Sequence, residues 1–285
     1  NNAPPKNEHE LLYRHVNSLV SRDGSYVRSK WGFTSEDLSS AASELAKLFA
    51  LSPDIGLSPT IDDLSKEAKR LGLFNNGLDA AIEALTYVKI GRTDVASSSS
   101  SERRFAFSHR RYHEAIFARY LSVNPDLIDT DELLSNPRWR EYLVAMLQSS
   151  SAGSHKLLIL SAAKLVRERV SILKFSEEKI SGFSVRTYSW GDQVLEHIFK
   201  LFVDIKKFNP SPDWQPVEKE VERLFGNLWS HGDLFDRLNI IKYGGAGDPD
   251  AHSRRLDFAM RSGVSMLQTE AILSCHFATR PSSDL

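Results

Sequence analysis

The order of two periodicities in the first half of the chain is the feature that most constrains the fold. Apolar side chains recur at helical spacing in three segments, 34–53, 58–74 and 75–88. Thr60 stands where the second segment needs an N-cap, and Gly72 stands where that segment should stop. We therefore expect three short amphipathic helices, each of which buries one face.

The composition then changes to that of β-strands. The segment 86–91 is rich in β-branched and aromatic residues, and 103–109 alternates apolar and polar side chains. The polar stretch between them, 92–102, contains a run of serines at 97–101. Three helices followed by a two-stranded hairpin are the elements of a winged helix, and the serine run would lie at the tip of its wing.

The remainder of the chain is helical throughout in pattern, without a repeat of fixed period. The predicted fold is therefore mainly α: a winged helix followed by an α-helical array. We divide the chain into a helical lead-in and linker (1–34), the winged-helix domain (35–122) and a helical sensor or scaffold domain (123–285). Within the lead-in, residues 9–19 are a helix candidate and residues 21–33 are expected to form a connection.

Composition and charge narrow the classes of function. With 285 residues, 41% of them hydrophobic and 26% charged, the chain can form two domains with separate cores. A formal net charge of −1 gives no excess of basic groups, so neither nucleic acid nor a lipid surface is an expected partner. No run approaches the roughly 20 apolar residues that cross a bilayer, and residues 1–10 lack the pattern of a secretory signal.

The single cysteine, Cys275, gives no internal disulfide and no thiolate metal site. A reducing compartment is the natural assignment, so we expect a cytoplasmic protein. The chain begins with Asn1 and has no initiator methionine, which leaves a fragment and a processed product both open.

The stretch 104–121, "RFAFSHRRYHEAIFARYL", begins like a strand and continues as a helix. Ser108 is placed to cap this helix, and His109, Arg110 and Arg111 lie at its start. Free backbone N–H groups, the helix dipole and these side chains together predict an anion site. One helical stripe should contain His109, Tyr112, His113, Ile116, Phe117, Tyr120 and Leu121, and the other side Arg110, Arg111, Glu114 and Arg119.

Three interpretations of the histidines compete. His109 and His113 lie four residues apart and could share a metal ion, but no third ligand stands at a recognisable spacing, so we predict no metal site. Packing within the apolar stripe is favoured for His113. For His109, packing and anion contact are equally supported, because it lies at the helix N-terminus, where an anion is attracted by the free N–H groups and the helix dipole.

The run 103–121, preceded by a winged-helix pattern and followed by "LLSNPRWREYLVAMLQ", resembles the regulatory module of STAND-class signal-transducing NTPases, particularly the NACHT type. The resemblance covers residues 35–150. It implies that a histidine at the start of the last winged-helix helix, here His109, touches the β-phosphate of the resting nucleotide. Ser108 and Arg110 depart from the Met-His-Asp motif of plant immune receptors, whereas Phe107 and the aromatic residue followed by glutamate suit the bacterial version.

The resemblance implies a partner domain as well. ATP or ADP would be held mainly by an upstream NTPase domain, with Mg²⁺ present only there, and the system would be an ATP-dependent switch of bacterial antiviral defence or signalling. It further implies a homo-oligomer on activation, with a trigger that could be a protein. The chain itself has no G-x-x-x-x-G-K-[ST] loop and no strand ending in paired acids, so we predict no catalytic residue and no ATP hydrolysis by this chain alone. The glycine-rich stretch 243–250 is expected to be a loop.

Two other functions stay in view. A winged helix can bind DNA, but the third helix and its approach, 71–88, contain Asp79 and Glu83 and no lysine or arginine, which disfavours a duplex. A helical adaptor for protein interactions is the second alternative, in which three tryptophans either form core or line a partner groove: Trp190, Trp214 and Trp229. A hydrolase is least favoured, because five further histidines lie scattered without a nucleophile at motif spacing: His155, His197, His231, His252 and His276.

Overall fold

The computed structural model describes residues 4–5, 8–74, 77–94, 103–148, 155–172, 176–180, 183–187, 193–208 and 213–275. These residues form a mainly helical protein, which confirms the predicted fold class at that level. The chain divides into two compact units, Asn1–Leu127 and Ile128–Leu285. The serine run 97–101 lies outside the described residues.

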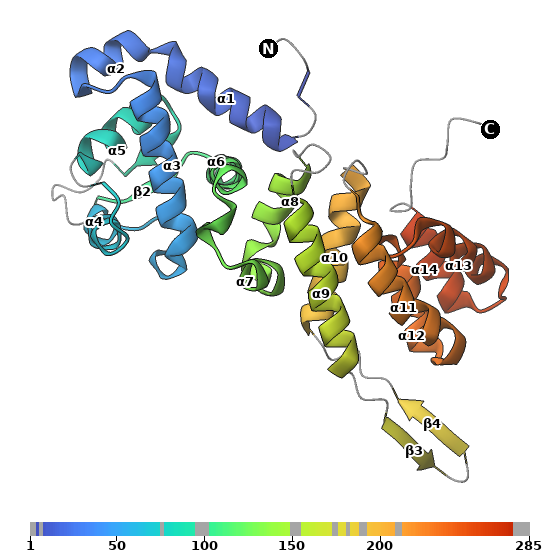
Figure 1. Cartoon of the computed structure of the whole chain (residues 1–285). Helices are drawn as coiled ribbons and strands as arrows, with labels where there is room; N and C mark the ends of the chain where they lie inside the picture. The colour runs from blue at the N-terminus through green and yellow to red at the C-terminus, as the bar shows by residue number, and fades with distance from the viewer. Residues whose placement is uncertain are drawn as a thin grey trace. The chain divides into compact units, whose positions relative to one another are not determined.

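The first unit contains six α-helices and one pair of strands among its described residues (Figure 1). Their bounds are α1 (Glu8–Arg22), α2 (Gly24–Trp31), α3 (Ser35–Leu51), α4 (Ile61–Arg70), α5 (Leu78–Tyr87), β1 (Gly91–Thr93), β2 (Phe105–Phe107) and α6 (Arg110–Val123). Two 3-10 turns, Pro53–Ile55 and Pro125–Leu127, follow α3 and α6. The three helices expected between residues 34 and 88 are present, each within its predicted segment.

Local signals fix the ends of these helices. The Thr34 hydroxyl accepts from the Asp37 N–H while the Asp37 carboxylate accepts from the Thr34 N–H, which is a capping box for α3. Thr60 caps α4 in the same way by accepting from the Asp63 N–H. Gly72, just past the end of α4, has a φ of +66° and so takes the left-handed conformation that glycine adopts without strain.

The two strands of the first unit pair antiparallel. Gly91 is opposite Phe107 and Thr93 is opposite Phe105. The second edge of β2 is fastened to the chain before α4, because the Phe105 N–H donates to the Pro59 carbonyl at 3.0 Å. A side chain at Gly91 would overlap the Phe105 ring, so only glycine fits there.

One correction concerns residues 21–33, which were expected to form a connection. They contain α2, a helix of eight residues that ends at Trp31 and is followed by Gly32 with φ +80°. Val27 is buried, and the rings of Tyr26 and Trp31 lie against Tyr87 of α5, at centroid distances of 4.8 and 5.5 Å. The helix is stabilised by these contacts, and two turns are too short to give a clear periodicity in the sequence.

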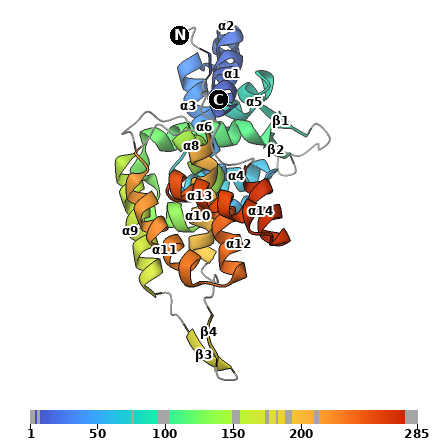
Figure 2. The same ribbon diagram turned by 90° about the vertical axis from the view of Figure 1, so that its right-hand side faces the viewer.

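The second unit is a helical array with one hairpin (Figures 1 and 2). Its helices are α7 (Thr130–Ser135), α8 (Arg140–Gln148), α9 (Lys156–Ile172), α10 (Gln193–Phe208), α11 (Gln215–His231), α12 (Leu234–Tyr243), α13 (Pro249–Arg261) and α14 (Ser265–Cys275), with 3-10 turns η3 (Pro137–Trp139) and η4 (Gly244–Ala246). Along one side of the array α9 packs on α11, α11 on α12, and α12 on α14. Large buried rings fill the interior, and Phe199 meets Phe225 at 5.1 Å between centroids.

The hairpin contradicts the expectation that this region is helical throughout. Strands β3 (Ser176–Ile180) and β4 (Phe183–Thr187) pair antiparallel between α9 and α10, with Ser176 opposite Thr187. Both views show the hairpin extending away from the helices (Figures 1 and 2). Five-residue strands are too short to stand out from helical neighbours in the sequence.

Candidate functional site

His109 lies where β2 passes into α6. Its backbone is extended, with φ −136° and ψ 131°, and the helix begins at the next residue. The Ser108 N–H donates to the Ile90 carbonyl at 2.8 Å and so holds the end of the strand in place. The side chain of His109 is exposed at the surface of the first unit.

The imidazole of His109 caps the helix, and the prediction that Ser108 would do so was wrong. The Arg111 N–H donates to Nδ1 of His109 at 3.2 Å, because His109 is the extended residue that directly precedes the first helical one. A ring nitrogen that accepts a hydrogen bond carries no proton. The neutral imidazole therefore has its proton on Nε2, which makes that edge a hydrogen-bond donor.

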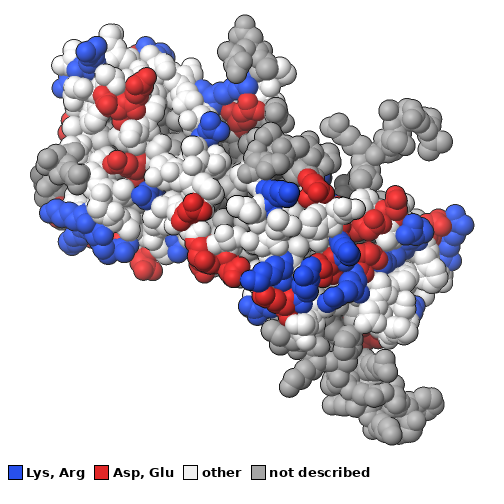
Figure 3. Space-filling model, viewed as in Figure 1, with Lys and Arg blue, Asp and Glu red and all other residues white. Residues whose placement is uncertain are grey.

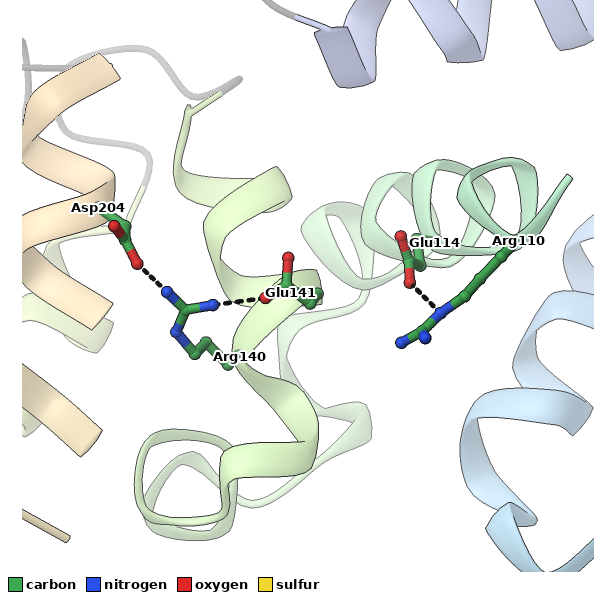
Figure 4. Close-up of polar contacts among 5 residues, drawn as sticks. All are labelled: Arg110, Glu114, Arg140, Glu141 and Asp204. Atoms are coloured by element: carbon green, nitrogen blue, oxygen red, sulfur yellow. Dashed lines mark hydrogen bonds and ion pairs between the residues drawn. The ribbon is translucent and has the colours of Figure 1, made fainter. Parts of the chain in front are cut away.

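The two arginines that follow both have acidic partners. Arg110 Nε lies 2.8 Å from Glu114 Oε1 one turn along the helix (Figure 4), and the Arg111 guanidinium contacts the Glu8 carboxylate of α1. The Arg110 side chain is 67% exposed. The Arg111–Glu8 pair is exposed on both sides, and pairs of this kind contribute about 0–1 kcal/mol, so a competing anion can replace the Glu8 carboxylate at little cost.

The structure also brings a residue of α1 to this site. The ring of Tyr112 lies close to two histidine rings, with centroid distances of 5.8 Å to His109 and 5.9 Å to His15. His15 and His109 are exposed, and Tyr112 is half-buried. Sequence reasoning did not find His15, because no local pattern shows that α1 packs along α6.

His113 is a packed residue, which confirms the interpretation that the apolar stripe favoured. Its ring lies 5.9 Å from that of Phe49 and 5.6 Å from that of Phe107. Burial lowers the pKa of His113 to about 4, against a hydrogen bond with the Ala46 backbone that favours the protonated form. Among the described residues no three His, Cys, Asp or Glu side chains gather as a metal site would require.

Glu114 was expected on the polar side of α6 but is buried, with 8% of its surface exposed. The reason is that both α1 and α3 pack against α6, so the middle of the helix is enclosed. The Arg110 guanidinium supplies the charge-assisted hydrogen bond that a buried carboxylate needs. Arg110 is therefore tied to its own helix as well as placed at the candidate site.

Ion pairs of the second unit converge on α11. Three glutamates of this helix pair with basic residues of three other helices: Glu218 with Lys206 of α10, Glu220 with Arg167 of α9, and Glu222 with Arg255 of α13. A further pair joins α8 to α10 through Arg140 and Asp204 (Figure 4). Because each of these pairs joins two different helices, we interpret them as contacts that hold the array together and not as a binding site.

The glycine-rich stretch 243–250, for which a loop is predicted, contains the connection between α12 and α13. Its centre is the 3-10 turn η4, which is largely buried and contacts α10, α11, α12 and α13. A side chain at Gly244 would overlap the imidazole of His252, and Asp248 caps α13 by accepting from the Ala251 N–H at 2.7 Å. These glycines serve close packing between helices.

The two tryptophans within the described residues of α11 and its start differ in burial. Trp214 is buried and its ring lies 5.5 Å from that of Phe202, so it belongs to the core. Trp229 is half-buried, 5.6 Å from the ring of Phe258. Trp190 lies outside the described residues.

Comparisons of the chain with protein-family models, with curated proteins and with solved structures find no match. Within the described part of the chain, no helix combines the length and the apolar character needed to span a bilayer.

Proposed function

We propose that the chain is the regulatory and sensor portion of a STAND-class, NACHT-type ATP-dependent signalling switch. In this proposal residues 35–122 act as a winged helix that holds the ADP-bound resting state, and residues 123–285 sense or scaffold. The upstream NTPase domain would supply the P-loop, most of the nucleotide contacts and the Mg²⁺ site. The setting would be bacterial defence, and activation would lead to a homo-oligomer in the cytoplasm.

The observation that carries the proposal is the exposed imidazole of His109 at the start of α6. The order of elements before it supports the same conclusion: α3, α4 and α5 are followed by the antiparallel pair β1 and β2, and α6 begins three residues after β2. This is the position at which the family places a nucleotide-sensing histidine.

The residues present fit a diphosphate. With Nδ1 occupied by the Arg111 N–H, the Nε2–H of His109 would donate to a phosphate oxygen. Arg111 contacts Glu8 through an exposed ion pair that an anion can displace. The Arg110 side chain is exposed and would add positive charge while it stays paired with Glu114. A bound ADP would supply the negative charge that these groups meet. Loss of the His109 contact would release the winged-helix domain to rotate away from its partner domain.

The test uses the protein joined to its NTPase domain and follows release of fluorescently labelled ADP. We expect His109→Ala to speed ADP release by about tenfold, the effect of losing one charge-assisted hydrogen bond, and to raise basal signalling. His231→Ala is the matched control, because it removes an exposed histidine of α11 that is no part of the candidate site. Equal release rates for wild type and His109→Ala would reject the assignment.

Binding of duplex DNA is the alternative, and the geometry of α5 weighs against it. The exposed side of this helix presents Asp79, Glu83 and Tyr87. Trp31 of α2 donates to the Glu83 carboxylate at 3.0 Å, and Tyr26 stacks on Tyr87, so α2 also covers part of the face that would enter a groove. We expect no salt-dependent shift of duplex DNA by the isolated chain, and tight salt-dependent binding would overturn this part of the proposal.

A further inference from the structure

The last two helices of the second unit have outer faces of different kinds. α13 buries Ala251, His252, Arg255, Leu256 and Ala259 and turns the opposite side outward. α14 buries Leu267, Ala271 and Ser274. The helices are joined by residues 262–264, pack on each other and on α12, and lie together at one end of the unit (Figure 1).

The outer face of α13 has charges that alternate in sign. Asp250, Arg254, Asp257 and Arg261 are all exposed, and their spacing of four, three and four residues places them in one stripe along the helix. Arg261 and Asp257 form a pair at 2.8 Å, with side chains 79% and 59% exposed. Figure 3 shows acidic and basic side chains intermixed over this end of the unit.

The outer face of α14 is apolar. Met266, Ile272 and Leu273 are 51, 57 and 54% exposed, and Glu270 is the only charged residue among the eleven of the helix. Thr269 is the polar residue that lies among these three on the exposed side of the helix. Exposed apolar side chains gathered on one face mark a candidate interaction surface.

The charge stripe of α13 is complementary to itself in one arrangement. When two copies of the helix lie antiparallel, one register places Asp250 of each copy opposite Arg261 of the other. The same register places Arg254 of each copy opposite Asp257 of the other. All four contacts then join opposite charges, as an isologous two-fold interface requires. A parallel arrangement in register would set every charge against its own kind.

We infer that α13 and α14 form a two-fold interface with a second copy of this chain. The antiparallel charge pairs of α13 fix the register, and the same axis lays the apolar face of α14 against its counterpart, which removes Met266, Ile272 and Leu273 from water. This interface is independent of the nucleotide-dependent switch, because none of its residues belongs to the α6 site.

The experiment measures the mass of the full chain by sedimentation equilibrium between about 1 and 100 μM, a range suited to an interface of ordinary size. We expect a species of twice 32.1 kDa whose fraction grows with concentration. Leu273→Glu should raise the dimer dissociation constant at least tenfold, whereas Lys164→Glu, a charge reversal at an exposed position of α9, should leave it unchanged. Circular dichroism confirms that each variant is folded.

Charge exchange tests the register. Arg254→Asp and Asp257→Arg each set like charges opposite one another at two places in their own homodimer, so each variant alone should be a monomer. A mixture of the two variants has opposite charges at all four contacts and should dimerise as the wild type does. A wild-type chain that stays monomeric throughout the range, or a mixture no more dimeric than its separate components, would overturn the inference.

Discussion

The buried imidazole of His113 should make the stability of the first unit depend on pH. Burial lowers its pKa to about 4 in the folded protein, and in the unfolded chain the pKa is about 6.5. Folding therefore favours the neutral ring. This contribution to stability is fully present above pH 6.5 and is lost as the pH falls from 6.5 toward 4, because the unfolded state takes up the proton first.

The magnitude follows from the difference between the two pKa values. A difference of one in pKa corresponds to 1.36 kcal/mol, so the full loss of unfolding free energy is about 3 kcal/mol. Lowering the pH from 7.5 to 5 accounts for about 2 kcal/mol of this loss. A loss of this size is a large fraction of the stability of an ordinary domain.

The assay is hydrogen exchange of peptides from α3 and α6 in the full chain, because these helices enclose the ring and report on the first unit alone. His113→Gln is the comparison, since glutamine can keep a hydrogen bond to the Ala46 backbone but does not titrate. Protection in the wild type should fall by about 2 kcal/mol between pH 7.5 and 5, and by much less in the variant. A His113 ring that titrates near pH 6.5 in an NMR experiment would refute the reasoning.

Two further predictions concern the second unit and can be read from urea unfolding curves. Gly244→Ala should lower the free energy of unfolding by about 1–3 kcal/mol, because the methyl group would overlap the imidazole of His252. Gly245→Ala is the control, since a methyl group there would lie 3.6 Å from the nearest side-chain atom and should be tolerated. Equal urea midpoints for the two variants would contradict this. Glu222→Ala should lower the free energy of unfolding by about 3–5 kcal/mol, since it leaves the buried guanidinium of Arg255 without its partner. Lys164→Ala breaks an exposed pair and should lower it by less than about 1 kcal/mol. A similar small effect for both variants would show that the pair with Arg255 adds nothing to stability.

Local signals made part of the fold predictable. The helices α3 and α4 have capping residues, Thr34 and Thr60, that satisfy backbone donors within three residues, so the sequence alone determines where they begin. The packing of His113 follows from its place in an apolar stripe at helical spacing. Each of these features depends on neighbours along the chain, which is the range that a single sequence displays.

The features that were missed depend on residues far apart in the sequence. α2 is stabilised by Tyr87 of α5, and Glu114 is buried because α1 and α3 enclose a helix whose sequence suggests one exposed side. At the candidate site the order of residues predicted His109 at a helix start, but not that its own ring would accept the Arg111 N–H in place of Ser108. Nothing in the sequence identified His15 as a neighbour of Tyr112.

The ion pairs of α11 give the second unit a property that stacked repeats lack. In a linear array each repeat touches only its neighbours, and terminal repeats can be removed one at a time with local effects. Here Glu222 reaches α13 while Glu220 of the same helix reaches α9, and η4 is enclosed by segments that span residues 193–261. A chain shortened before α13 would leave the Glu222 carboxylate without its partner and one side of the glycine turn uncovered, so the unit should fold only once its last helices have left the ribosome.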